Sequence, residues 1–153
     1  MAETPEFPRT QLTVPFKPFT PDEVHRITGC DIKTVAFWFE NLQVAYKGDL
    51  GLDGFDYMGA FAVFCGKVWL EQGASAGRAS AVVNFLAHVK QEVLEFNLNK
   101  GLAYPAIIPV GGNWRGMFEV VPDLPLARKL DLRMLYGEFK KRLKDWEESY
   151  KTN

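Results

Sequence analysis

Two histidines, His25 and His88, and two cysteines, Cys30 and Cys65, are the side chains with the greatest capacity for catalysis or metal binding. They form no HExxH, CxxC or GxSxG motif, and the sequence contains no phosphate-binding P-loop. The sequence therefore predicts a protein that is not an enzyme and that needs no metal and no cofactor. Both cysteines lie in apolar helical contexts, which indicates buried thiols rather than a disulfide and fits a reducing cytoplasm.

A different chemistry, the recognition of nucleic acid, is available at three neighbouring positions of a predicted helix. Lys33 can pair with a phosphate or a guanine, Thr34 can hydrogen-bond a phosphate or a base edge, and Phe37 can touch a thymine methyl group. We expect these residues to contact DNA, and the alternative is a solvated helix with Phe37 in the core. Arg26, in the preceding helix, and Lys47, in the following hairpin, are candidate phosphate contacts.

A second candidate contact lies near the glycine turn at Gly111, Gly112 and Asn113. A phosphate-binding loop would need a following helix and a lysine, so a turn between two strands is the better interpretation. Trp114 and Arg115 follow this turn, and both residue types are enriched where proteins bind partners. The pair predicts a protein contact or a ligand lid, with the alternative that Trp114 packs back onto its own sheet. Any small-molecule effector is unknown.

The elements that position Lys33, Thr34 and Phe37 are two short helices joined by a tight turn. Thr20 and Glu23 form a Thr-x-x-Glu capping box, and a proline suits the first helical position between them. Gly29 ends the first helix, because glycine enters the left-handed region at little cost. Asp31 can cap the second helix. The bulky apolar positions of that helix are Val35, Trp38 and Phe39.

The order of residue types around Gly29 continues through a possible wing and a further helix. The turn carries Ile27, Thr28, Gly29, Asp31, Lys33, Thr34 and Val35, and the second helix then carries the aromatic pair Phe37 and Trp38. Downstream stand Gly54, Phe55, Asp56 and Tyr57, and then Gly73 and Ser75. Over residues 19–90 this order resembles the MerR-like winged helix-turn-helix family. The resemblance implies a second helix that enters the DNA major groove.

Two positions differ from that family's pattern, and the charge of the surrounding segment is negative where a DNA-binding surface is normally positive. Ala36 stands where the family usually has an arginine that reaches DNA phosphate, and Asp56 replaces the basic residue of the wing. Residues 1–58 contain five Lys and Arg against nine Asp and Glu, a formal charge of −4. Duplex binding normally draws much of its affinity from neutralised phosphates. These features favour an alternative, a protein-interaction module that keeps the fold without binding DNA.

The rest of the chain completes a mainly α fold with small β elements. Residues 1–18 form an extended, proline-rich arm, and residues 42–58 suit a short hairpin or wing. A helix that is apolar almost all round covers 58–71, and a long helix runs from Ser75 to about Asn99 with an apolar seam for a partner. The appendage then has two strands over 103–122 and a helix from 124 to about 150. The seam comprises Val82, Leu86, Val89, Val93 and Phe96. The apolar side of the last helix comprises Leu126, Leu130, Met134 and Leu135.

These features predict three parts: an arm at 1–18, a winged helix-turn-helix domain with its long helix at 19–100, and a C-terminal hairpin-helix appendage at 101–153 for dimerisation or ligand sensing. With a net charge of −1 in 153 residues, no membrane-spanning run and no signal-peptide pattern, we expect a cytoplasmic protein. The predicted function is that of a sequence-specific DNA-binding transcription regulator that acts as a homodimer on double-stranded DNA. The alternatives are the interaction module and a phage-type packaging or excision protein.

Overall fold

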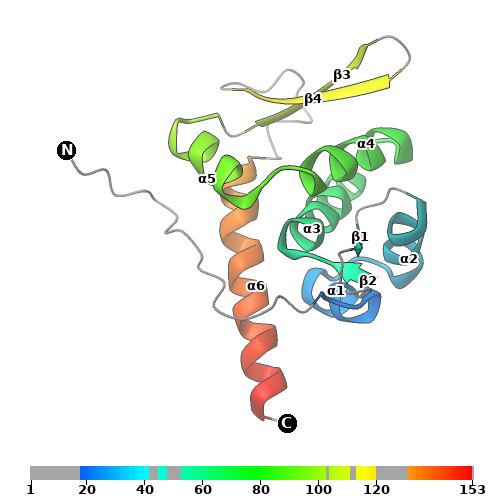
Figure 1. Cartoon of the computed structure of the whole chain (residues 1–153), viewed down its shortest axis with the longest axis vertical. Helices are drawn as coiled ribbons and strands as arrows, with labels where there is room; N and C mark the ends of the chain where they lie inside the picture. Colours follow the sequence, from blue (N-terminus) through cyan, green and yellow to red (C-terminus); the bar gives the residue numbers. More distant parts are fainter. Residues whose placement is uncertain are drawn as a thin grey trace, which may run out of the picture.

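The computed structural model describes residues 18–41, 45–47, 53–102, 104–110, 113–119 and 131–152. In these residues the fold is mainly α-helical, with six helices and two antiparallel β-hairpins (Figure 1). The helices are α1 (Pro21–Thr28), α2 (Ile32–Asn41), α3 (Tyr57–Glu71), α4 (Ala76–Ala87), α5 (Gln91–Asn99) and α6 (Leu132–Thr152). The strands are β1 (Ala45–Lys47), β2 (Asp53–Phe55), β3 (Tyr104–Val110) and β4 (Asn113–Glu119). The predicted arm at 1–18 lies outside the described residues except for its last residue, Pro18.

The helix pair α1 and α2 begins and ends as its capping residues predict. The Thr20 Oγ1 atom accepts a hydrogen bond from the Glu23 amide at 3.1 Å, and the Thr20 amide donates to Glu23 Oε1 at 2.9 Å. Gly29 ends α1 with φ 75°, in the left-handed region. The Lys33 amide donates to Asp31 Oδ2 at 3.1 Å, so Asp31 caps the start of α2. The capping box, the glycine turn and the second cap are thus confirmed.

The predicted wing is a short hairpin. The chain just before α1 pairs with its second strand. Strands β1 and β2 pair antiparallel, with Ala45 opposite Phe55 and Lys47 opposite Asp53. Phe19 then exchanges two backbone hydrogen bonds with Phe55, each of 2.8 Å. The connection at 48–52 lies outside the described residues. The hairpin therefore joins the start of α1 to the start of α3.

Helix α3 is the centre of the core, and it is buried on almost every side as its composition predicts. Its Gly66 lies where α2 and α4 come closest. A Cβ atom at Gly66 would lie 2.7 Å from Trp38 Cη2 and would also collide with the Val83 side chain. The Trp38 indole, which is 2% exposed, donates from Nε1 to Ser80 Oγ of α4 at 3.0 Å. The absent side chain of Gly66 thus allows α2, α3 and α4 to pack together.

The predicted long helix from Ser75 to Asn99 is wrong, because the chain breaks into α4 and α5. The His88 amide donates to the Phe85 carbonyl at 3.2 Å, a bond that tightens the last turn of α4. Its ring atom Nδ1 bonds the Asn84 carbonyl at 2.7 Å, which satisfies another terminal carbonyl. Lys90 is extended, with φ −70° and ψ 145°, and starts α5. The predicted seam divides with the helix: Val82 and Leu86 are buried, while Val93 and Phe96 are exposed.

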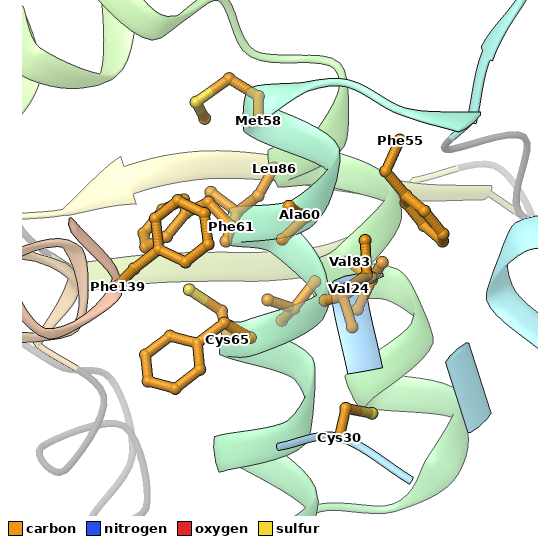
Figure 2. Close-up of a cluster of buried hydrophobic side chains, with 14 of the residues drawn as sticks. Val24, Cys30, Phe55, Met58, Ala60, Phe61, Cys65, Val83, Leu86 and Phe139 are labelled. Atoms are coloured by element: carbon orange, nitrogen blue, oxygen red, sulfur yellow. The ribbon is translucent and has the colours of Figure 1, made fainter. Parts of the chain in front are cut away.

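Helix α6 is the longest described helix, and its first half joins the core through two aromatic rings. Tyr136 and Phe139 are fully buried, with centroids 5.2 Å and 5.5 Å from the Phe61 ring of α3. Figure 2 shows Phe139 beside Phe61 among the buried side chains. The predicted apolar side is wrong at Met134, which is 73% exposed because the neighbouring Leu132 and Tyr136 turn inward. The predicted start at 124 is also wrong, because α6 begins at Leu132, after Asp131, whose Oδ1 accepts a hydrogen bond from the Arg133 amide at 2.8 Å. Leu126 and Leu130 lie outside the described residues.

The hairpin of β3 and β4 pairs Tyr104 with Glu119 and Val110 with Asn113, which confirms the two predicted strands. It lies at one end of the molecule, over α4 (Figure 1). The predicted boundary at residue 100 stays a prediction, although α6 shares one core with α3. No helix in the described ranges is both long enough and apolar enough to cross a bilayer.

The packing at Gly66 predicts opposite effects for two helical glycine substitutions. Gly66→Ala should lower the free energy of unfolding by about 1–3 kcal/mol, because the new methyl group overpacks the contact with Trp38 and Val83. Gly137→Ala, in α6, should raise it by about 0.5–1 kcal/mol, because nothing lies within 4 Å of the new Cβ and alanine favours the helix. Urea unfolding followed by circular dichroism measures both. A stabilised Gly66→Ala protein would contradict the packing.

Candidate nucleic-acid interface

The orientation of α2 decides which of its side chains can meet a ligand. Val35 and Trp38 face the core, with exposed fractions of 0% and 2%. Phe37, next to Trp38 in the sequence, is 53% exposed, and Ile32 is 40% exposed. Phe37 therefore does not lie in the core, and the aromatic pair divides between the inner and outer faces of the helix.

The three predicted recognition residues lie on or beside this outer face of α2. Lys33 is exposed one helical turn before Phe37, and Ala36 is exposed between them. Thr34 is half-buried, with its backbone in the same turn. The structure thus brings Lys33, Thr34 and Phe37 together within two turns of one helix. We define this set, with Ile32 and Ala36, as the outer face of α2.

The other two predicted phosphate contacts lie on separate elements. Arg26 is on α1, where its Nε donates to Asp22 Oδ2 at 3.0 Å. Their side chains are 65% and 59% exposed, and an ion pair this accessible is worth little, so a phosphate can compete with Asp22 for the arginine. Lys47 lies on β1, in register with Asp53. The position of the Lys47 side chain lies outside the described part of the structure.

The charge around α1 and α2 is negative. Residues 18–41 contain two basic side chains, Arg26 and Lys33, and four acidic ones, which gives a formal charge of −2. The acidic residues are Asp22, Glu23, Asp31 and Glu40. Two of them serve local structure, because Glu23 closes the capping box and Asp31 caps α2. Part of the negative charge therefore shapes the helices and is partly compensated by backbone amides.

Asp56, which replaces a basic residue of the resembled wing motif, has a structural role here. Its Oδ1 accepts a hydrogen bond from the Gly59 amide at 2.6 Å and caps α3. Burial raises the pKa of the Asp56 carboxyl above its usual value, and the bond from Gly59 opposes that rise. The aspartate at this position therefore serves to begin a core helix, α3.

The turn between the helices holds a histidine and a thiol in structural contacts. His25 Nδ1 bonds the Cys30 carbonyl at 2.6 Å, so His25 ties the turn together and is only partly exposed. Burial raises the pKa of the Cys30 thiol to about 12, and it also raises the pKa of Cys65. Both cysteines are free and buried, as predicted. Protonated, buried thiols of this kind are poor nucleophiles.

Two cations that the sequence did not place at this site converge on the turn. Lys67 Nζ of α3 and Arg142 Nη1 of α6 each lie 3.5 Å from the position of a Cβ on Gly29. Arg142 donates from Nη1 to the Thr28 carbonyl at 3.4 Å, and its guanidinium lies 5.2 Å from the Phe64 ring centroid. Both charges stand at the negative end of the α1 dipole. No local signal predicts a contact across 114 residues.

The second predicted pair, Trp114 and Arg115, lies away from α2. Both are on β4, where Trp114 pairs with Pro109 and Arg115 with Ile108. This hairpin packs on α4, at the far end of the molecule from α1 (Figure 1). Their side chains lie outside the described part of the structure. Their role as a protein contact or lid stays a prediction.

Comparisons with known proteins find no relative of this chain. A scan against protein-family models gives no match, and neither the curated proteins nor the solved structures contain a match to the chain. Within the described residues, no group of three His, Cys, Asp or Glu side chains could hold a metal ion. The outer face of α2 and the elements that present it therefore remain the features that bear on function.

The position of Arg142 predicts a stabilising role at the end of α1. Arg142→Met removes the guanidinium over Phe64, the bond to Thr28 and the ion pair with Glu138, and it should lower the free energy of unfolding by about 1 kcal/mol. The value is small because the side chain is 36% exposed. Lys144→Met, at an exposed site of the same helix, is the matched control and should change stability by less than about 0.5 kcal/mol. Equal urea midpoints for the two variants would contradict the role given to Arg142.

Proposed function

We propose that the protein binds double-stranded DNA through the outer face of α2 and acts as a sequence-specific transcription regulator in the form of a homodimer. The observation that carries this proposal is the division of α2, with Val35 and Trp38 inside and Lys33 and Phe37 outside. A helix held by one face and exposed on the other is what a major-groove contact requires. The order of α1, α2, hairpin and α3 supports it, since the MerR-like family that the sequence resembles has the same order.

Each residue of the proposed site has a defined task. Lys33 pairs with a phosphate or a guanine, Thr34 hydrogen-bonds a phosphate or a base edge, and Phe37 contacts a thymine methyl group. Arg26 and Lys47 hold phosphates on either side. In a homodimer, two copies of α2 would lie in successive major grooves, about 34 Å apart. The negative charge around α1 and α2 makes the affinity modest, and the phosphate contacts of the three basic residues make it fall as the salt concentration rises.

The proposal predicts the salt dependence of binding to a labelled random-sequence duplex. Fluorescence anisotropy should show submicromolar binding at about 50 mM salt that collapses at about 200 mM. Lys33→Gln should weaken binding and reduce the steepness of log K against log salt by about 0.9 per protomer, or about 1.8 for the dimer, because each protomer loses one phosphate contact. Lys90→Gln, an exposed change between α4 and α5, is the control and should leave the slope unchanged. Equal slopes for the two variants would remove Lys33 from the interface.

A second candidate function is favoured by the apolar character of the same surface. Ile32 and Phe37 are both exposed, Ala36 lies between them, and the surrounding segment is acidic. Such a surface suits a protein partner with an apolar groove and a basic rim. If the folded protein binds no duplex at either salt concentration, the interaction module replaces the DNA-binding proposal.

A further inference from the structure

The outer face of α2 carries apolar side chains at positions that face a ligand. Ile32 is 40% exposed and Phe37 is 53% exposed, and Ala36 is exposed as well. Ile32 and Ala36 are four residues apart, so they are neighbours along the helix surface, and Phe37 lies beside them. These three side chains therefore form one continuous apolar surface, which we call the apolar strip of α2.

The core fixes the direction in which the apolar strip points. Val35 is fully buried, and Trp38 Nε1 donates to Ser80 Oγ of α4 at 3.0 Å. Turning α2 to bury the strip would break this hydrogen bond and expose Val35, and both changes cost free energy. The strip is therefore already in place before a ligand binds, which lowers the cost of binding.

The residue types of α2 limit the base edges that it can read. Arginine reads guanine, and asparagine or glutamine reads adenine, but none of these three types occurs from Ile32 to Glu40. Lys33 is the one cation of that span, and it can reach a guanine or a phosphate. Glu40, exposed one turn after Ala36, can accept a hydrogen bond from a cytosine amino group. Apolar contact is therefore the main readout that the rest of this face can supply.

The major groove of a duplex presents one kind of apolar group, the methyl group on C5 of thymine. Alanine and phenylalanine are among the side chains that contact it. 5-Methylcytosine carries the same group at the same ring position, whereas uracil and unmodified cytosine lack it. From Ile32 to Phe37 the helix rises about 7.5 Å, close to two base-pair steps of about 3.4 Å. The strip is therefore long enough to meet methyl groups on neighbouring base pairs.

The position of Lys33 favours a duplex over a protein groove as the ligand of this face. Lys33 is exposed and lies one turn before Ala36 and Phe37, so a ligand that covers the strip also approaches its ammonium group. An apolar protein groove would remove water from that charge without replacing it, which is costly. A duplex instead offers it a phosphate or a guanine.

We propose that the apolar strip of α2 reads C5-methyl groups, so that the preferred ligand is a duplex with C5-methylated pyrimidines on neighbouring base pairs. The inference rests on the proposed binding of DNA, which assigns one thymine contact to Phe37. It extends that contact to Ile32 and Ala36, and from thymine to 5-methylcytosine. Ala36, which stands where the resembled family has an arginine, then serves to bring the helix close to a methyl group.

Duplexes that differ only in the C5-methyl group measure this preference. One pair has alternating A·T base pairs, with thymine or with uracil, and the other has alternating G·C base pairs, with 5-methylcytosine or with cytosine. Burying one methyl group is worth about fourfold in affinity, so two of them should give about tenfold or more. Fluorescence anisotropy at about 50 mM salt should therefore show tighter binding to the methylated member of each pair. A preference in only one pair supports the inference and identifies the base that is read.

Variants separate contact with the methyl group from an effect of methylation on the shape of the duplex. Phe37→Ala and Ile32→Ala should each reduce the preference for the methylated duplex by about fourfold, because one methyl group loses the side chain that covers it. Phe96→Ala is the matched control, since it removes an exposed phenylalanine from α5, and it should leave the preference unchanged. Thermal unfolding of each variant shows that its fold is intact.

The possible failures are distinguishable. Equal affinity for the methylated and unmethylated duplexes overturns this inference and leaves DNA binding in place. A preference that both Phe37→Ala and Ile32→Ala retain in full also overturns it, because the discrimination then comes from the duplex itself. If the folded protein binds none of these duplexes, the inference and the proposed function both fail, and the protein-interaction module remains.

Discussion

The close approach of α2 and α4 across Gly66 is the constraint on which the proposed recognition surface depends. With no side chain at this position, Trp38 and Val83 enter the same space above α3. The bond from the Trp38 indole to Ser80 then fixes the rotation of α2. Once Trp38 points inward, helical geometry places Lys33 and Phe37 outward. One absent methyl group in the core therefore determines which residues of α2 face outward.

Helix α6 holds several other helices of the fold in place. Its rings at Tyr136 and Phe139 pack on α3, and its two arginines hold the ends of other helices. Arg133 bonds the last turn of α5, and Arg142 bonds the last turn of α1. Positive charge at these carboxyl ends opposes the helix dipoles. The orientations of α1 and α5 are thus linked through one helix.

Local patterns predicted much of the fold, because caps and glycine turns act within a few residues. The capping box at Thr20, the turn at Gly29 and the buried helix α3 all follow from such signals. The break between α4 and α5 could not be predicted, since no glycine or proline marks it and it depends on His88 and Lys90. Met134 was placed on the wrong side because the apolar spacing of α6 fits more than one face.

The candidate site was predictable in part. The apolar spacing placed Val35 and Trp38 on one side of α2. It did not decide whether Phe37 lies in the core or on the surface. That choice depends on Gly66 and Ser80, which are distant in sequence. The two cations beside Gly29, Lys67 and Arg142, come from still further along the chain. Contacts of this range leave no local pattern, so only the folded structure brings them to the turn.

The most direct measurement of the central claim is a ¹H–¹⁵N correlation spectrum of the protein titrated with a short duplex at low salt. The amide signals of Lys33, Ala36 and Phe37 should shift first and furthest, with smaller changes in the hairpin around β1 and β2. The Trp38 indole signal should stay in place, because its bond to Ser80 holds it inside. Shifts centred on α5 or on the hairpin of β3 and β4, or none at any duplex concentration, would contradict the assignment of α2 as the recognition helix.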